Sequence, residues 1–253
     1  MGEINAGIGM SASAARTRPW VWVTTRLLAL PVALVRRVPF SLVMIGLVLL
    51  LAYRTGSIHG GLDHGIRERW GYDLDNLRQG HLWVLLSSEV LTGYPAHVHN
   101  TVWMLIAWLV PYEAIAGTGR ALVSYWVGTL VGTGGAALIS LLVIQTVGWD
   151  RSPDLVHGAD VGASVGAWGV AGALSVWLVS RGSLWRAAGL IFPLVGLSYL
   201  DNILVARWGI SDLAHPIGLA TGLAASVLLT PHWDHGAPPS QTGPGPTRGR
   251  RPS

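Results

Sequence analysis

Residues 162–169 read GASVGAWG and open an apolar run that continues through Leu178. Small residues crowd this stretch around one hydroxyl, that of Ser164, at the point where a membrane helix is expected to begin. The last apolar run, residues 213–229, carries a single imidazole, His215, at a similar depth from its own start. Polar side chains inside a bilayer are costly and usually functional. Because a serine and a histidine brought together form a nucleophile and its base, Ser164 and His215 are candidate catalytic residues.

The composition indicates a membrane protein. Of the 253 residues 51% are hydrophobic and only 12% are charged, which is too apolar for an ordinary soluble domain of this size. The fold class predicted is therefore an all-α membrane protein, a bundle of six transmembrane helices. The six predicted spans are residues 39–53, 95–112, 121–147, 162–179, 184–200 and 213–229.

These spans predict one membrane domain, residues 39–230, between two polar ends. Residues 1–38 are expected to form a cytoplasmic segment with an interfacial helix, because charge and proline interrupt its apolar stretch. Residues 231–253 are rich in proline and glycine and are predicted to be disordered. Residues 54–94 mix aromatic, apolar and acidic side chains, which favours a long loop with short helices near the membrane interface.

The arginines predict the orientation of the chain. All 17 basic residues are arginine, and six spans place both termini on the same side. With cytoplasmic termini, the cytoplasmic side holds 11 of these arginines and the outer side holds 6, as the positive-inside rule requires. We therefore expect a multi-pass protein of the plasma membrane with both termini cytoplasmic. Ser164 and His215 then lie at comparable depths near the outer face.

The order of these motifs resembles that of the rhomboid intramembrane serine proteases. The resemblance covers roughly residues 80–229 and rests on Gly-x-Ser at Ser164 and on His-x-x-Gly-x-x-x-Gly from His215. It implies a serine–histidine dyad that hydrolyses peptide bonds of transmembrane protein substrates without a cofactor. In that family an aromatic residue often stacks on the catalytic histidine. Trp168, one helical turn after Ser164, takes this place.

The same resemblance implies oxyanion and substrate-binding residues. The family has a histidine at the top of the second span, which corresponds to His97. Its asparagine, four residues later, is Thr101 here, and Asn100 stands one position earlier. These three side chains are candidate donors, together with Gly162 and the backbone N–H of Ser164.

Other residues are interpreted as structural. Three pairs of glycines four residues apart predict close helix packing that brings the fourth and sixth spans together. They are Gly128/Gly132, Gly162/Gly166 and Gly218/Gly222. Asp212 lies one turn before His215 and is interpreted, with Ser211, as an N-cap of the sixth helix and not as a third catalytic residue. Glu113, at the cytoplasmic end of the second span, is expected to bond loop amides.

Two alternative functions remain open. The chain could be a catalytically inactive rhomboid-like protein that binds transmembrane helices. This alternative is supported by Val165, where the family usually has glycine, and by Thr101. A small transporter or channel would use the same polar residues, but the sequence lacks the repeated, interrupted helices expected there.

Several other classes are excluded or disfavoured. The absence of cysteine excludes disulfides, thiol catalysis and cysteine-bound zinc. The histidine pairs lie on loops, at the edge of a span or in the tail, and no His-Glu-x-x-His helix occurs, so no metal site is expected. The net charge of +4 is carried mostly by the flanks and tails, which disfavours nucleic-acid binding. The expected partners are transmembrane protein substrates and the lipid bilayer.

Overall fold

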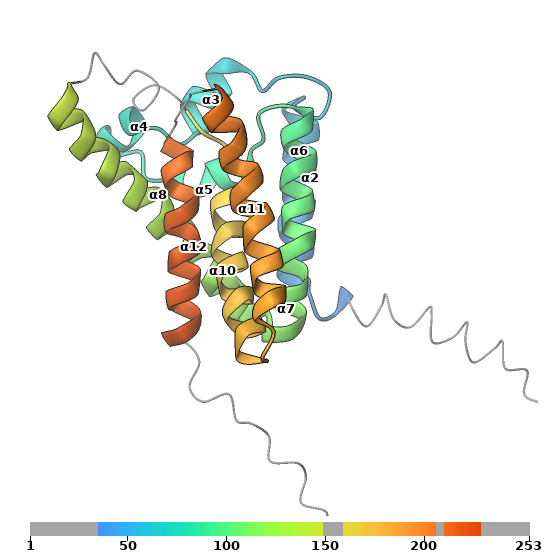
Figure 1. The fold of residues 1–253 in the computed structure, drawn as a ribbon. Helices are drawn as coiled ribbons and strands as arrows, with labels where there is room; N and C mark the ends of the chain where they lie inside the picture. Colours follow the sequence, from blue (N-terminus) through green and yellow to red (C-terminus); the bar gives the residue numbers. More distant parts are fainter. Residues whose placement is uncertain (1–34, 149–158, 206–209, 229–253) are drawn as a thin grey trace, which may run out of the picture.

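The computed structural model describes residues 35–148, 159–205 and 210–228, and this part of the chain is a bundle of helices (Figure 1). Its helices are α2 (Pro39–Arg54), α3 (His64–Trp70), α4 (Leu74–Arg78), α5 (Val84–Ser87), the 3-10 turn η1 (Ser88–Val90), α6 (Pro95–Met104), the π-helical turn η2 (Leu105–Leu109), α7 (Val110–Ala116), α8 (Thr118–Val147), α10 (Ser164–Ser180), α11 (Leu184–Val205) and α12 (Ile210–Leu228). The N-terminal segment expected to hold an interfacial helix, residues 1–38, is described only from residue 35, and the C-terminal tail lies outside the described residues.

Each of the six apolar segments is helical, and the loop of residues 54–94 contains the short helices α3, α4 and α5 with η1 at one end of the bundle (Figure 1). The second segment runs through α6, η2 and α7 without a break. Its π-helical turn immediately precedes the turn that contains Pro111. Proline has no N–H to donate and its ring clashes with the carbonyl four residues earlier, so a widened turn is the expected response.

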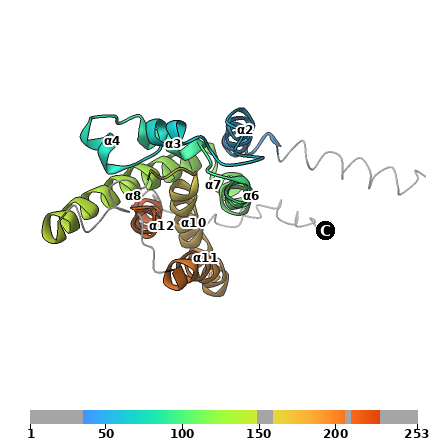
Figure 2. The same cartoon turned by 90° about the horizontal axis from the view of Figure 1, so that it is seen from above.

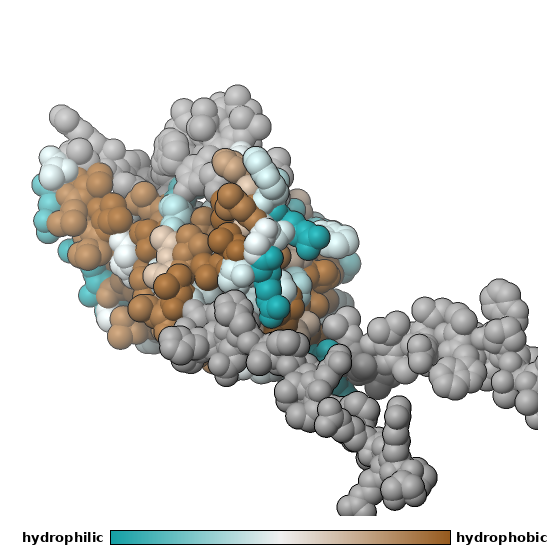
Figure 3. Space-filling model, turned by 60° about the horizontal axis from the view of Figure 1, so that its bottom comes forward, coloured by the Kyte–Doolittle hydropathy of each residue, from teal (hydrophilic) through white to brown (hydrophobic). Residues whose placement is uncertain are grey.

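The described helices differ in length, and several expose large apolar side chains. Among the described residues one helix, Thr118–Thr146, is long and apolar enough to cross a bilayer, and Pro39–Arg54 and Ser164–Ser180 are shorter apolar helices. Large apolar side chains point outward from α2 and α8, for example Leu50 (57% exposed) and Leu138 (60% exposed). Figure 3 shows hydrophobic side chains spread over the face turned to the viewer. Such an extended apolar surface indicates contact with lipid or protein.

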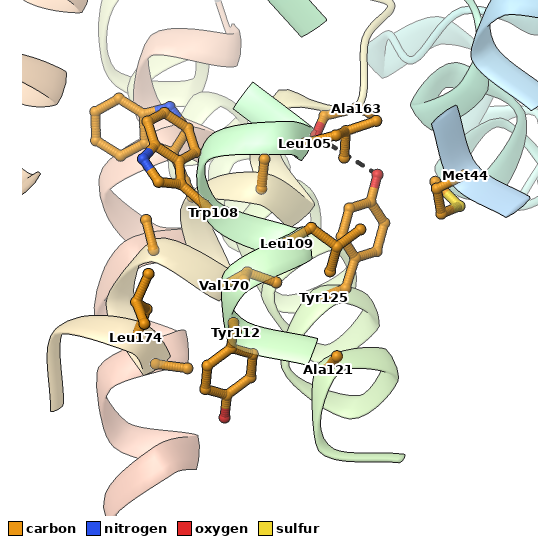
Figure 4. Packing of buried hydrophobic residues seen from close by; sticks show 14 of the residues in the cluster. Met44, Leu105, Trp108, Leu109, Tyr112, Ala121, Tyr125, Ala163, Val170 and Leu174 are labelled. Carbon is orange, nitrogen blue, oxygen red and sulfur yellow. Dashed lines mark hydrogen bonds between the residues drawn. The ribbon is translucent and has the colours of Figure 1, made fainter. Parts of the chain in front are cut away.

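Helix α10 lies at the centre of the bundle. It packs against α8, α12 and α11, and against η2 on another side (Figures 1 and 2). Every residue from Val165 to Ser175 is buried. A helix that is apolar on all sides belongs in the interior, which agrees with the sequence of this segment. In the main core cluster Val170 of α10 lies with Leu109 and Tyr125 (Figure 4).

Glycines let α8, α10 and α12 approach one another closely. A Cβ added to Gly222 would lie 1.8 Å from the carbonyl oxygen of Gly169, and one added to Gly128 would lie 2.8 Å from the Gly169 Cα. The close packing predicted between the helices of residues 162–179 and 213–229 is therefore confirmed for α10 and α12. Gly169, which belongs to none of the predicted pairs, is the residue that both neighbouring helices contact.

Glu113, in α7, joins this helix to α2 at one end of the bundle. Its buried carboxylate accepts the backbone N–H groups of Phe40 (2.9 Å) and Ser41 (2.7 Å), the Ser41 hydroxyl (2.6 Å) and the Thr118 hydroxyl (2.8 Å). The predicted structural role is confirmed, but the amides belong to the first turn of α2 and not to a loop. A carboxylate at this place satisfies amides that have no partner within the helix.

The N-cap interpretation of Ser211 and Asp212 is wrong. Helix α12 begins at Ile210, so both residues lie inside its first turn. The Ser211 side chain instead bonds the carboxyl of Asp160, in the loop before α10. The backbone of Asp160 in turn exchanges two hydrogen bonds of 2.8 Å with Tyr72. Ser211 therefore ties the start of α12 to the loops at that end of the bundle.

Candidate active site

The turn before α10 presents Ser164. Gly162 has a φ of 138°, which favours glycine, and its N–H donates to the Ser88 carbonyl at 2.7 Å. Ala163 is the N-cap, so Ser164 is the first residue of the helix. Ala163 and Val165 are buried, whereas Ser164 is partly exposed. Of these three residues, Ser164 alone is therefore accessible to another molecule.

The structure brings Ser164 and His215 together. His215 Nε2 lies 2.8 Å from Ser164 Oγ, within hydrogen-bond reach. The Trp168 ring stacks on the imidazole, with centroids 5.1 Å apart and planes 19° apart. The contact and the stacking predicted from the sequence are both present. An imidazole whose Nε2 faces a hydroxyl in this way can accept the hydroxyl proton when a nucleophile is needed.

Close packing between α10 and α12 explains this contact. A Cβ added to Gly218 would lie 2.9 Å from the Val165 carbonyl oxygen, so this glycine lets the two backbones meet. The Val165 side chain faces Gly132 of α8 and Gly218, where added Cβ atoms would lie 2.6 and 3.2 Å from its Cγ1. Glycines on the neighbouring helices thus make room for Val165. The valine at this position is compatible with the contact between Ser164 and His215.

His97 is oriented by a backbone amide. Its Nδ1 accepts the N–H of Gly93 at 3.2 Å, so in the neutral ring the proton must be on Nε2. That Nε2 lies over the turn before Ser164, because a Cβ on Gly162 would be 2.5 Å from it. The ring therefore presents an N–H donor to the region next to the candidate nucleophile. A side chain on residue 162 would collide with this donor.

The two remaining candidate donors differ in position. Thr101 lies one turn after His97 on α6, is 1% exposed, and its hydroxyl has no hydrogen-bond partner among the described residues. Asn100 is exposed on the same helix. Thr101 therefore shares the buried face below His97, whereas the structure does not bring Asn100 to the site.

The backbone groups that hydrogen-bond to the site residues were not predicted from the sequence. Gly93 orients His97 through its N–H, and Ser88 holds Gly162 through its carbonyl. Both contributions come from main-chain atoms, which no side-chain pattern in the sequence could mark.

Comparison with known protein families gives one match. Residues 79–232 match the rhomboid domain, which is more than half of the chain and includes every candidate site residue. These limits agree with the extent of the resemblance found in the sequence, residues 80–229. No curated protein matches the chain.

Proposed function

Because this chain belongs to the rhomboid family, whose members are membrane proteins and usually intramembrane serine proteases, we propose that it is an intramembrane serine endopeptidase. Its substrates are transmembrane proteins, which it cleaves near the outer face of the membrane. The observation that carries the proposal is the 2.8 Å contact between Ser164 Oγ and His215 Nε2 at the start of the central helix.

In the proposed reaction Ser164 Oγ attacks the carbonyl carbon of the scissile peptide bond while His215 Nε2 takes the hydroxyl proton. The tetrahedral intermediate collapses, His215 gives the proton to the leaving nitrogen, and the new amine departs. Water then attacks the acyl-enzyme ester and loses its proton to His215, which returns it to Ser164 Oγ as the acid product leaves.

The oxyanion of each intermediate needs donors that are already in place. The backbone N–H of Ser164 is one, because amides in the first turn of a helix have no partner within the helix. The Nε2–H of His97 is the second. Thr101 is a third candidate, because its buried hydroxyl has no partner within the described part of the chain. Gly162 contributes space and not a donor, since its N–H is bonded to Ser88.

The proposed setting is the plasma membrane. The proposed topology has six spans, formed by α2, by α6 to α7, and by α8, α10, α11 and α12, with both termini in the cytoplasm. The arginine distribution supports this orientation. Helix α11 is the proposed lateral gate for substrate. Its packing supports this role, because the contacts that α11 makes among the described residues are mainly with α10.

The decisive experiment measures processing of a tagged transmembrane substrate in cells. Ser164→Ala and His215→Ala should each abolish cleavage as fully as the double variant, because residues that act as one catalytic unit are far from additive. Labelling of wild-type Ser164 by a fluorophosphonate or isocoumarin-type probe is the second readout. Cleavage that continues undiminished in Ser164→Ala would refute the proposal.

The same experiment tests the alternative, an inactive rhomboid-like protein that binds transmembrane helices. Its supporting observation is that threonine stands at position 101, where the family has asparagine. If the wild type neither cleaves nor labels, while helical partners still co-purify with it and with Ser164→Ala, the binding function is favoured.

A further inference from the structure

A buried carboxyl group lies behind the turn that carries Ser164. Glu89, in η1, is 1% exposed, and its Oε2 accepts the hydroxyl of Tyr125 at 2.9 Å. Tyr125 comes from α8 and is fully buried. Neither residue takes part in the chemical steps above. A buried acid requires a specific reason, because taking a carboxyl group out of water is costly unless it is paired.

The pair contacts the backbone next to the nucleophile. The Tyr125 hydroxyl lies 3.5 Å from the carbonyl oxygen of Ala163, the N-cap of α10 (Figure 4). The ring of Tyr125 supports the first turn of α10, because a Cβ on Gly166 would lie 2.5 Å from its Cζ. The residue before Glu89 also contacts this turn, since the Ser88 carbonyl accepts the N–H of Gly162 at 2.7 Å.

We propose that Glu89 and Tyr125 are positioning residues, which hold the turn of Gly162 and Ala163 and so keep Ser164 aligned with His215 and with the oxyanion donors. This inference rests on the proposed protease function. The nucleophile and its base come from helices joined by glycine contacts, and the Glu89–Tyr125 pair contacts the turn from η1 and α8. Loss of the pair leaves Ser164 and His215 present but lets the turn shift, and with it Ser164. A misplacement of about 1 Å is enough to reduce turnover about 10²-fold.

The protonation state of the Glu89 carboxyl group is consistent with this positioning role. Burial raises the pKa of the Glu89 carboxyl to about 8. The Tyr125 and Thr129 side chains and the Gly166 amide oppose this effect, and the charge of Asp160 adds to it. At neutral pH the group is mostly protonated, and a protonated carboxyl can donate to the Tyr125 oxygen instead of accepting from it. The tyrosine proton is then left for the Ala163 carbonyl. Above the pKa the carboxylate competes for that proton, and the hold on Ala163 weakens.

Three variants of the full chain test the inference. Tyr125→Phe keeps the ring against Gly166 and removes only the hydroxyl. Glu89→Gln keeps a neutral group that can donate and accept. Tyr112→Phe is the matched control, because Tyr112 is a buried tyrosine of the same core whose hydroxyl lies 3.3 Å from Ser124 and away from the turn. The readouts are kcat and KM for a transmembrane substrate across pH, and amide hydrogen exchange in the peptide that spans residues 160–168.

Tyr125→Phe should lower kcat by about 10-fold to 100-fold at unchanged KM and speed exchange in that peptide. Tyr112→Phe should change neither quantity. Glu89→Gln should retain wild-type kcat at pH 7 and lose less activity than the wild type between pH 7 and 9. That pH difference would not arise from a role in general stability alone.

These measurements distinguish an error in this inference from an error in the proposed protease function. An active wild type whose kcat is the same in Tyr125→Phe as in Tyr112→Phe overturns the inference, whatever the exchange shows. If the wild type neither cleaves nor labels, the proposed protease function fails. In that case exchange alone decides whether the pair holds the turn, and equal exchange in the two phenylalanine variants overturns the inference.

Discussion

His97 illustrates how a single side chain acquires its role from a backbone atom. The ring could carry its proton on either nitrogen, and the N–H of Gly93 assigns it to Nε2 by bonding Nδ1. Because Nε2 lies over Gly162, the donor faces the turn before Ser164, where the proposed reaction forms its oxyanion. Neighbouring His99 is exposed, and its Nδ1 lies 2.8 Å from the Pro95 carbonyl oxygen, so it has a different role.

His97→Ala is therefore expected to lower kcat by about 10²–10³, the usual result of removing one oxyanion donor. KM should change little, because the donor acts mainly in the transition state. The measurement is steady-state cleavage of a transmembrane substrate in detergent or vesicles. His99→Ala is the matched control and should keep wild-type activity. Equal losses in the two variants would contradict the assigned role of His97.

The buried carboxyl group of Asp160 should make the stability of the folded protein depend on pH. Burial raises its pKa to about 6, the charge of Asp212 adds to this, and the Val161 amide, Arg67 and Ser211 oppose it. The folded protein therefore keeps a proton that the unfolded chain releases above about pH 4. The free energy of unfolding therefore decreases as the pH rises from about 4 to about 6, and it stays lower above pH 6.

Asp160→Asn should consequently raise the unfolding temperature at pH 8, and its advantage should shrink toward zero near pH 4. The asparagine carbonyl can still accept the Ser211 hydroxyl, so the loop contact is retained. Thermal unfolding of both proteins in detergent at pH 4.5, 6 and 8 checks the expectation. An advantage of the same size at all three values would show that ionisation of Asp160 does not limit stability.

Packing between α10 and α12 determines whether Ser164 and His215 come within hydrogen-bond reach. The backbone of Gly169 lies against Gly128 of α8 and Gly222 of α12, so the three helices meet with no side chain between them. In a bundle whose outer surface is apolar, close backbone packing of this kind contributes where the hydrophobic effect between helices is weak. The distance between Ser164 and His215 therefore depends on glycines located below the site.

Gly222→Ala should separate α10 from α12, because the new Cβ would lie 1.8 Å from a backbone oxygen. Overpacking of this kind costs typically about 1–3 kcal/mol, and the shift should also abolish probe labelling of Ser164. Gly134→Ala on α8 is the control, since nothing lies within 4 Å of its added Cβ. It should be neutral or stabilising by up to about 1 kcal/mol. Normal labelling in Gly222→Ala would contradict the account of helix packing.

The two ends of the whole molecule differ in character. Helices α3 and α4 gather at one end, and the turn between α7 and α8 lies at the other (Figure 1). The proposed orientation places the first end outside the cell and the second in the cytoplasm. Since the chain has no cysteine, a single introduced thiol reports its own location without background.

His64→Cys should react with a membrane-impermeant maleimide on intact cells, because residue 64 is exposed on α3. Gly119→Cys, at the start of α8, should react only after the cells are permeabilised. Gly119 is exposed and an added side chain meets nothing within 4 Å, so the change should not disturb the fold. The reverse pattern of labelling would invert the topology and place the site on the cytoplasmic side.

The sequence by itself determined the helical segments and the rhomboid family. It also predicted the contacts of His215 with Ser164 and Trp168 that the structure shows. These follow from local patterns: apolar runs, a serine at a helix start, and an aromatic residue one turn later. Helix ends were predicted less well, as with Ser211 and Asp212, because the first turn of α12 depends on contacts with a distant loop.

Only the tertiary structure decided the proton position on His97, the role of Gly169 between α8 and α12, and the pairing of Glu89 with Tyr125. Each of these joins groups that are distant in the chain or act through main-chain atoms. A local pattern carries no record of such contacts. They arise because helix packing buries particular polar groups, and a buried polar group must take whichever partner the packing brings within reach.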